Sequence, residues 1–351
     1  MFDINFYMSS YELQKRLASG EKLAREHVMR EFEKARSRKP VVYNIETTNA
    51  CNMKCRMCPR TTMMTRKVET MDKGLFGAVV GQLEPFPPGL WAKWEEFVLR
   101  EYGIPKDAMS ENHFFLHIIP KVIQLHGYGD PLLDVNMPDY VKLLADRGFK
   151  SYFSCNPANI DIDKTVRMFE NGLNYIKYSI ESVDDAKHKA IRGEASDFSG
   201  SYRNITRLLE LKAKRGYKTV IIITMLDLNR TGQAGEYEKL NEVFQGAGVY
   251  IYLKSEDQQW YRKDFHGTKS VHWSEICKHP WMSATVKSNG EVVMCMEDFN
   301  NEIILGDARK ESLESIWNGS KYEKFRKDHF DLAKGIKCTE ECDMKMAGEY
   351  F

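Results

Sequence analysis

After residue 40 the sequence alternates between short runs of β-branched and aromatic residues and longer amphipathic stretches. Runs of the first kind favour extended backbone, whereas stretches with apolar residues three and four positions apart favour helices. The predicted strands are VVYNIET (41–47), KVIQLHG (121–127), KSYFSC (150–155), YIKYSIE (175–181), TVIIITML (219–226) and VYIYLK (249–254). Six strand–helix units in succession predict an α/β protein with a parallel sheet, open or curled into a partial barrel.

Three of the predicted helices end in the same way. The stretches MPDYVKLLADRG, KTVRMFENG and YRNITRLLELKAKRG close on Gly148, Gly172 and Gly216. A glycine just past a helix tolerates the left-handed conformation that caps the last carbonyl groups. These glycines therefore mark the C-terminal ends of three helices.

Three segments fall outside the alternation. Residues 1–39 are predicted to form an N-terminal helical cap of one or two helices. Residues 84–119 interrupt the barrel region 40–255, and Trp91, Trp94, Val98 and Tyr102 have the spacing of one helical face. This insertion is predicted either to act as a substrate lid or to pack over an exposed seam of the barrel. In residues 256–351 the alternation of predicted strands and helices stops, and this segment is predicted to form a second, smaller domain.

Charge and hydropathy exclude several classes of partner. The 51 Lys and Arg residues balance 50 Asp and Glu residues, which argues against a nucleic-acid or anionic-membrane partner. The N-terminal sequence does not resemble a signal peptide, and no segment has the roughly 20 apolar residues of a membrane helix. The sequence thus predicts a cytoplasmic protein. In a reducing compartment, its eight cysteines favour metal binding or catalysis over disulfides.

Three cysteines form a compact group in CNMKCRMC, residues 51–58. Cys51, Cys55 and Cys58 follow the first predicted strand, and catalytic sites of parallel α/β folds gather at the C-terminal ends of strands. Thiolates at this spacing suit zinc or an iron–sulfur cluster. Structural zinc usually takes four protein ligands, so zinc would need a fourth ligand from a distant part of the chain. A cluster held by three cysteines instead leaves one iron open for another ligand.

The CxxxCxxC spacing resembles that of the radical S-adenosylmethionine (radical SAM) enzymes, with Met57 at a usually aromatic position. The resemblance covers most of residues 40–351 and implies a partial (β/α)6 TIM-like barrel. It also implies a [4Fe–4S] cluster whose open iron binds the amino and carboxylate groups of SAM. Reductive cleavage of SAM would then give a 5′-deoxyadenosyl radical that abstracts hydrogen from an unactivated C–H bond.

The same resemblance implies contacts with SAM from the ends of the next strands. GYGDP (127–131) is similar to the family's GGEP-type turn, with Asp130 in the place of glutamate, and SCNP (154–157) is similar to its TNG-type segment. Each of these residues alone could be an ordinary polar residue at a strand end. The implied cofactor contacts are Met57, Gly127, Tyr128, Gly129, Asp130, Ser154, Asn156, Ser179, Glu181 and Arg192. Glu46, Thr47 and Asn49 are candidates for lining the cavity below the cluster.

Four further cysteines lie near the C-terminus, at Cys277, Cys295, Cys338 and Cys342. NGEVVMC and the segment after it resemble the SPASM/twitch extension of radical SAM enzymes. A full SPASM domain uses more cysteines, so four favour the shorter α+β twitch form with one auxiliary [4Fe–4S] cluster. A structural zinc site with four cysteine ligands is the alternative.

Cys155 belongs to neither group. A lone buried cysteine is usually a small hydrophobic residue. Its position near the expected SAM site also allows a catalytic role, in which the thiol donates a hydrogen atom to a substrate radical, as a radical epimerase requires.

The resemblance is closest in plan to twitch dehydrogenases that act on aminocyclitol alcohols, because no leader-binding domain is recognisable within residues 1–39. It implies oxidation of a secondary alcohol on a small, polar, sugar-like substrate. Such an enzyme takes electrons from a donor such as flavodoxin or ferredoxin, and it needs a proton acceptor, for which His126, His188 and Glu46 are candidates. A radical epimerase, a peptide maturase and a non-catalytic barrel with structural metal sites are the alternatives.

Overall fold

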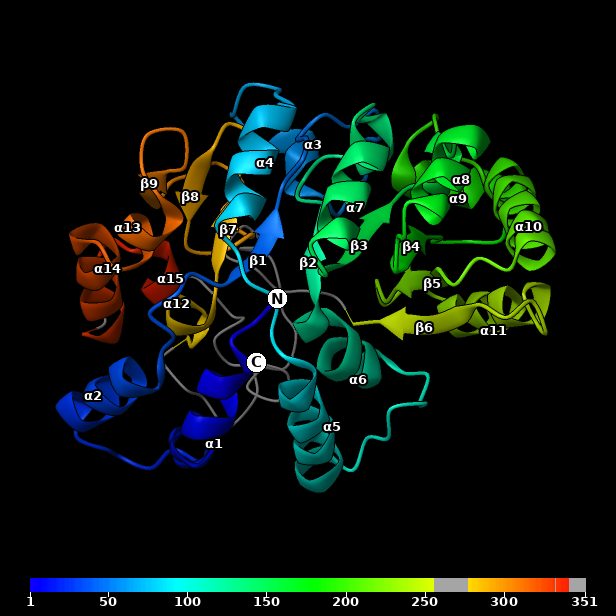
Figure 1. The fold of residues 1–351 in the computed structure, drawn as a ribbon. Helices are drawn as coiled ribbons and strands as arrows, with labels where there is room; N and C mark the ends of the chain where they lie inside the picture. Colours follow the sequence, from blue (N-terminus) through cyan, green and yellow to red (C-terminus); the bar gives the residue numbers. More distant parts are fainter. Residues whose placement is uncertain (256–276, 332, 341–351) are drawn as a thin grey trace.

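The computed structural model describes residues 1–255, 277–331 and 333–340, and its strands form one nine-stranded sheet (Figure 1). The strand order is β6-β5-β4-β3-β2-β1-β7-β8-β9, and the two edges do not pair with each other. The six predicted strands are confirmed. They are β1 (Val42–Ile45), β2 (Val122–Gln124), β3 (Lys150–Cys155), β4 (Tyr175–Ser179), β5 (Val220–Leu226) and β6 (Tyr250–Lys254), all parallel. The sheet is therefore the predicted open, partial barrel.

Helices connect the strands and flank both sides of the sheet (Figure 1). The longer helices are α1 (Ile4–Ala18), α2 (Arg25–Ala35), α4 (Lys73–Gly81), α5 (Pro88–Tyr102), α7 (Met137–Asp146), α8 (Ile162–Glu170), α9 (Asp185–Arg192), α10 (Phe198–Arg215), α11 (Gln233–Val243) and α14 (Ser320–Phe330). The short ones are α3 (Pro59–Thr62), α6 (Glu111–His113), α12 (His279–Met282), α13 (Leu313–Trp317) and α15 (Lys337–Glu340). Within the described residues, no helix has the length and apolar character needed to cross a membrane.

The two faces of the sheet belong to different hydrophobic clusters. The outer face, which includes Phe153 and Ile176, packs against α4, α7, α8 and α10. The inner face, which includes Tyr152 and Ile222, packs against Phe114 and against α1 and α5. Because side chains alternate along a strand, neighbouring residues of β3 to β6 point to opposite clusters.

The insertion at 84–119 packs against the rest of the molecule. In α5, Trp94 and Val98 are almost completely buried, and the indole N–H of Trp94 donates to the carbonyl of Leu116 at 2.7 Å. The rings of Tyr7 from α1 and Trp94 pack edge to face, with their centroids 5.2 Å apart. These contacts show the insertion packed against α1, and both predicted roles, over a seam of the barrel or as a lid, stay predictions.

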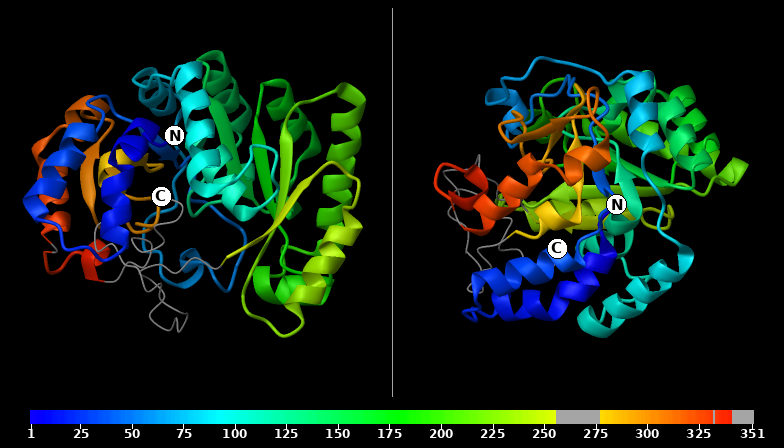
Figure 2. Two further views of the ribbon diagram at one scale, coloured as in Figure 1. Left: turned by 90° about the horizontal axis from the view of Figure 1, so that it is seen from below. Right: turned by 60° about the vertical axis from the view of Figure 1, so that its left-hand side comes forward.

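The N-terminal helices also contact the C-terminal part of the chain (Figure 2, left). Arg25 of α2 donates to the carbonyl of Phe330 at 2.6 Å, and the indole N–H of Trp281 donates to Glu33 at 2.9 Å. Residues 1–39, predicted to form one or two helices, contain two, α1 and α2.

The sheet continues across the domain boundary predicted at residue 256. The short strand β7 (Ala284–Val286) pairs in parallel with β1, and β8 (Glu291–Val293) and β9 (Ile304–Asp307) follow in antiparallel fashion. The backbone N–H of Glu46 donates to the carbonyl of Val286 at 2.9 Å. The pairing of β7 with β1 thereby attaches the C-terminal cysteine region to the strand that precedes the first cysteine group.

Candidate active site

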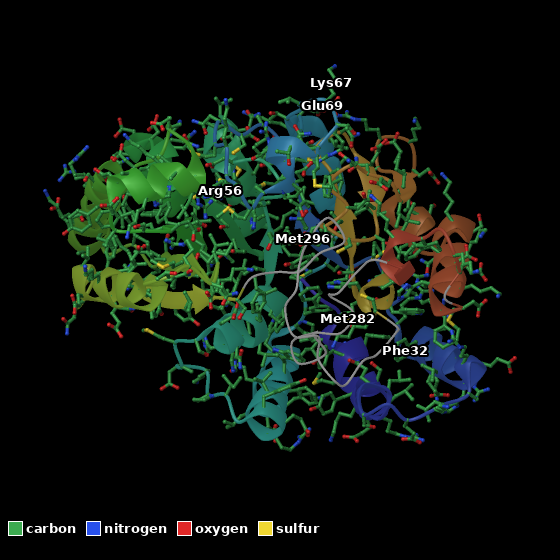
Figure 3. All side chains as sticks on the ribbon, turned by 180° about the vertical axis from the view of Figure 1, so that it is seen from behind. Phe32, Arg56, Lys67, Glu69, Met282 and Met296 are labelled. Carbon is green, nitrogen blue, oxygen red and sulfur yellow. The ribbon has the colours of Figure 1, made fainter. Side chains whose placement is uncertain are left out.

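The first cysteine group lies in the loop between β1 and α3, which is anchored on the end of α9. The backbone N–H groups of Lys54 and Arg56 donate to the carbonyls of Arg192 and Ile191, both at 3.0 Å. Figure 3 shows Arg56 on this loop. Two hydrogen bonds to a neighbouring helix fix the path of the chain on either side of Cys55.

The three thiols influence one another's ionisation. Burial raises the pKa of Cys58 to about 12, and the nearby Cys55 and Cys51 add to this effect because like charges repel. Burial also raises the pKa of Cys51. The charge of Arg192 offsets part of the rise in the pKa of Cys58, and the guanidinium Nη1 of Arg192 donates to the sulfur of Cys55 at 3.6 Å. A positively charged metal centre bound by these thiols would favour their thiolate forms.

Arg192 connects this loop to the end of β4. Its Nη2 donates to the carboxylate of Glu181, and Glu181 in turn accepts the backbone N–H of Leu226 at 2.9 Å. The structure thus brings together Cys55, Arg192 and Glu181, which the sequence places far apart. The Nε of Arg192 is buried without a partner among the described residues.

The GYGDP turn packs directly on the segment that precedes Cys51. A Cβ atom on Gly129 would lie 2.2 Å from the carbonyl oxygen of Thr48, and the backbone N–H of Asp130 donates to the carbonyl of Ala50 at 2.8 Å. Only glycine permits this approach of two backbones. The turn is therefore built against the cysteine loop, as a shared binding site requires.

Substitution of Gly129 by alanine is expected to move the turn, because backbone atoms cannot yield as a flexible side chain can. Overpacking of this kind costs about 1–3 kcal/mol of stability. We expect a lower thermal midpoint and weaker SAM binding, measured by calorimetry and by equilibrium dialysis. Gly77→Ala in α4 is the matched control, since its added Cβ meets nothing within 4 Å. Equal behaviour of the two variants would show that the close approach is unimportant.

The carboxylate of Asp130 is occupied by hydrogen bonds inside the protein. It accepts the backbone N–H of Leu132 at 2.9 Å, that of Asn156 at 3.0 Å, and the side-chain amide of Asn159 at 2.8 Å. Asp130 therefore joins the turn to the end of β3. SAM binding by the backbone of this turn stays a prediction.

The other predicted residues at the ends of β3 and β4 lie on different faces of the sheet. Ser154 and Ser179 share the inner face with Tyr152 and are partly exposed. Cys155 lies on the outer face in the hydrophobic cluster with Phe153, and its thiol donates to the carbonyl of Lys177 at 3.7 Å. Burial raises the pKa of Cys155 well above its usual value. The structure does not bring this thiol to the inner face, where a hydrogen-atom donor would act.

Of the three predicted proton acceptors, two are histidines whose acceptor nitrogen is already used. Nδ1 of His126 accepts the backbone N–H of Ser154 at 3.1 Å, and Nδ1 of His188 accepts that of Glu181 at 3.3 Å. Burial lowers the pKa of His126 well below its usual value and that of His188 to about 4, so both rings are neutral near pH 7. A neutral imidazole that accepts at Nδ1 carries its proton on Nε2 and can only donate there.

The third, Glu46, follows β1 and is completely buried in an ion pair. Nη2 of Arg66 lies 2.8 Å from both carboxylate oxygens, and Ser288 donates its N–H and its hydroxyl at 3.3 and 3.1 Å. Burial alone would raise the pKa of Glu46, but the charges of Lys287 and Arg66 hold it below its usual value. Glu46 is therefore a weak base that joins three segments of the chain.

The partners of Glu46 also hold the loop that follows Cys295. Nε of Arg66 donates to the carbonyl of Phe299 at 2.7 Å, and Nζ of Lys287 donates to that of Met296 at 2.9 Å. Figure 3 shows Met296 near the centre of the molecule. Glu46 was a candidate from the sequence, whereas its partners Arg66, Lys287 and Ser288 were not, because no motif connects residues so far apart.

Thr47 and Asn49 were predicted to line a cavity. In the structure, their side chains donate hydrogen bonds to backbone carbonyl groups. The hydroxyl of Thr47 donates to the carbonyl of Leu125 at 3.2 Å, and the amide of Asn49 donates to that of Lys67 at 2.8 Å. Both residues are completely buried. Met57, beside the last cysteine of the loop, is half-buried.

Three of the four C-terminal cysteines lie within the described residues. The backbone N–H of Cys277 donates to Nε2 of His329 at 2.9 Å, Cys295 follows β8, and Cys338 is buried in α15. Cys342 lies outside the described residues. In the part of the chain that the structure describes, no three His, Cys, Asp or Glu side chains are arranged to hold a metal ion.

Comparison with family models identifies the protein class. The model of the radical SAM superfamily matches residues 45–231, more than half of the chain, including the first cysteine group and the GYGDP turn. The chain belongs to the radical SAM superfamily. A second model, SPASM, described as an iron–sulfur cluster-binding domain, matches residues 277–343. The cofactors of this radical SAM protein are therefore a [4Fe–4S] cluster, SAM and an auxiliary iron–sulfur cluster.

This radical SAM protein is similar, at low sequence identity, to a curated enzyme and to two solved structures. The S-adenosyl-L-methionine-dependent 2-deoxy-scyllo-inosamine dehydrogenase of Niallia circulans is 19% identical over 285 residues, covering 81% of this chain and 84% of that protein. Streptococcus suis SuiB, solved with its precursor peptide SuiA, has a TM-score of 0.52 at 12% identity, covering 97% of this chain and 82% of that one. Histidine-tagged anSMEcpe with bound AdoMet has a TM-score of 0.52 at 14% identity, covering 89% and 92%. At such low identities, the similarity to the two solved structures shows a shared fold alone.

The residues at the end of β1 fit the cofactors of a radical SAM protein. Three thiols are the donor set of an iron–sulfur cluster with one open iron. Two buried donors near them, Nε of Arg192 and Nδ2 of Asn156, have no partner among the described residues. Buried donors without acceptors are costly, and an acceptor on a bound ligand would remove that cost.

Proposed function

We propose that this radical SAM enzyme is a dehydrogenase that oxidises a secondary alcohol of a small, polar, sugar-like or aminocyclitol substrate. The observation that carries the proposal is the relationship to the 2-deoxy-scyllo-inosamine dehydrogenase, which extends over most of both chains. The count of four C-terminal cysteines adds support, since it suits one auxiliary cluster. When bound, SAM and the two clusters supply hydrogen abstraction and an electron acceptor.

In this proposal, each cofactor is held by residues of a separate group. Cys51, Cys55 and Cys58 hold the first cluster, and Cys277, Cys295, Cys338 and Cys342 hold the auxiliary cluster. The predicted contacts with SAM are Met57, the turn 127–130, Ser154, Asn156, Ser179, Glu181 and Arg192. A small electron-transfer protein such as a flavodoxin or a ferredoxin supplies the electron that starts the reaction.

The inner face of the sheet offers polar groups for a hydroxylated substrate. The ring of His126 packs beside Tyr152 of the inner face, with ring centroids 5.3 Å apart, and carries its proton on Nε2. Lys177, which is 6% exposed, places its ammonium group 5.1 Å from the centre of the Phe114 ring. Hydrogen-bond donors and a desolvated cation are suited to hydroxyl and other oxygen groups. In this role His126 orients the substrate by donating a hydrogen bond, and the proton acceptor is another group.

The position of Cys155 bears on the rival proposal of a radical epimerase. An epimerase would need a hydrogen-atom donor near the substrate, and the Cys155 thiol lies on the outer face among apolar side chains. A peptide maturase would require a cognate precursor peptide. Oxidation of an alcohol requires neither of these.

The proposal is tested by turnover of deuterated substrates under anaerobic conditions. The reconstituted, reduced enzyme is incubated with SAM and with aminocyclitols and sugars, including 2-deoxy-scyllo-inosamine, that carry deuterium on the carbinol carbon. We expect transfer of that deuterium to 5′-deoxyadenosine and formation of a ketone. Solvent hydrogen at the same carbon with inverted configuration would instead show an epimerase. Turnover of a precursor peptide but of none of these alcohols would also overturn the proposal.

A further inference from the structure

A chain of four hydrogen bonds, three of them buried, runs from the end of β4 to the end of β3. The backbone N–H of Glu181 donates to Nδ1 of His188 at 3.3 Å, and Nε2 of His188 lies 3.0 Å from the hydroxyl of Ser196. That hydroxyl donates to Oδ1 of Asn156 at 3.1 Å, and Oδ1 also accepts the backbone N–H of Ala158 at 2.8 Å. His188 and Ser196 are completely buried, and Asn156 is 3% exposed.

The direction of each hydrogen bond in this chain is determined by its first donor. A backbone N–H can only donate, so Nδ1 of His188 is an acceptor and the ring proton of the neutral histidine is on Nε2. Nε2–H therefore donates to Ser196, whose own hydrogen is left to donate to Asn156. Burial lowers the pKa of His188 to about 4, which keeps the ring in this neutral form at physiological pH.

These hydrogen bonds determine the orientation of the side-chain amide of Asn156. An asparagine amide can turn by half a rotation and exchange its oxygen for its nitrogen, which reverses donor and acceptor. Here two donors converge on Oδ1, so the oxygen cannot leave that position without losing both hydrogen bonds. The nitrogen is held on the opposite side, where Nδ2 is buried and has no partner among the described residues.

Asn156 lies beside the groups that are proposed to bind SAM. Its backbone N–H donates to Asp130 of the GYGDP turn at 3.0 Å. The charge of Asp130 raises the pKa of Cys51, and the charge of Arg192 lowers the pKa of Asp130. An unpaired amide donor at this place needs an acceptor, and SAM carries a carboxylate and ribose hydroxyls.

We propose that His188 and Ser196 are positioning residues that fix the Asn156 amide as a hydrogen-bond donor to SAM. The proposal rests on the SAM site proposed above. It gives roles to two residues outside the cluster motif, and it assigns His188, considered above as a proton acceptor, to orientation of a cofactor contact.

The test measures SAM affinity without turnover, by equilibrium dialysis of radiolabelled SAM against the reconstituted, unreduced enzyme. Asn156→Asp preserves the shape and both hydrogen bonds into Oδ1 but has no amide donor, so we expect affinity to fall about tenfold or more. Ser196→Ala removes one of the two hydrogen bonds that hold Oδ1 and leaves the one from Ala158, so we expect a fall of about three- to tenfold. His188→Phe, which removes the donor to Ser196, is expected to lower affinity in the same range.

Ser201→Ala is the matched control. Ser201 is also completely buried, and its hydroxyl donates at 2.6 Å to the backbone carbonyl of Asp197, which takes no part in this chain of hydrogen bonds. We expect unchanged SAM affinity in this variant. Thermal midpoints of all variants separate a loss of binding from a loss of folding. In the Asn156→Ala background, Ser196→Ala is expected to cause no further loss, since the two residues act through one contact.

The outcomes distinguish an error in the positioning role of His188 and Ser196 from an error in the proposed SAM site. Weakened binding in Asn156→Asp, with Ser196→Ala and His188→Phe equal to Ser201→Ala, would leave Asn156 in the SAM site and refute the positioning role. Unchanged binding in Asn156→Asp would refute the contact itself. A further loss from Ser196→Ala in the Asn156→Ala background would show that Ser196 acts by another route.

Discussion

Replacement of Cys51, Cys55 and Cys58 together by alanine is expected to abolish reductive cleavage of SAM and to remove about four of about eight irons per chain. These thiolates are the proposed ligands of the cluster with the open iron, and no other group that the structure describes at the end of β1 replaces them. Iron, sulfide and zinc are counted in anaerobically reconstituted protein, and 5′-deoxyadenosine is measured after reduction. The remaining irons should belong to the auxiliary cluster in the SPASM region at 277–343.

Cys155→Ala is the matched control for this experiment, because Cys155 is buried near the site but packs among apolar side chains of the outer face. We expect its iron content and SAM cleavage to equal those of the unsubstituted protein. A triple variant that kept about eight irons would contradict the ligand assignment. A count of about four irons and one zinc in the unsubstituted protein would contradict the auxiliary cluster and remove the electron acceptor that the proposed oxidation needs.

Glu46→Gln is expected to lower the free energy of unfolding by about 3–5 kcal/mol, because it breaks a buried ion pair and leaves a charge without its partner. The side chain of Glu46 is fully buried and that of Arg66 is 7% exposed. Lys287, also completely buried, would keep its charge near that of Arg66. The loss should appear as a fall of several degrees in the thermal midpoint of the reconstituted protein.

Glu210→Gln provides the comparison, since Glu210 pairs with Arg207 at the surface with both side chains 60% exposed. Exposed pairs contribute about 0–1 kcal/mol, so we expect almost no change. Addition of Arg66→Met to Glu46→Gln should restore part of the stability, because the unpaired guanidinium is removed. If Glu46→Gln were no more damaging than Glu210→Gln, the junction around Glu46 would not stabilise the fold.

Much of the fold followed from local sequence. All six predicted strands are present, because each run of β-branched and aromatic residues is buried on both sides of a parallel sheet. Gly148, Gly172 and Gly216 follow α7, α8 and α10 with φ angles of +78°, +90° and +70°, as predicted for helix ends. The spacing of Cys51, Cys55 and Cys58 identified the family, since it depends only on neighbours in one loop.

What the sequence left open depended on contacts between distant segments. Because both faces of the central strands are apolar, alternation along β3 does not reveal whether Cys155 or Ser154 points to the inner face. The pairing of β7 with β1 and the ion pair of Glu46 with Arg66 join segments that no local pattern relates. His188 likewise acquires its role from Glu181 and Ser196 only once the chain is folded. Local propensities and spacing therefore determined the elements and the first cluster motif, whereas the orientation and protonation of the surrounding side chains were decided by tertiary hydrogen bonds and burial.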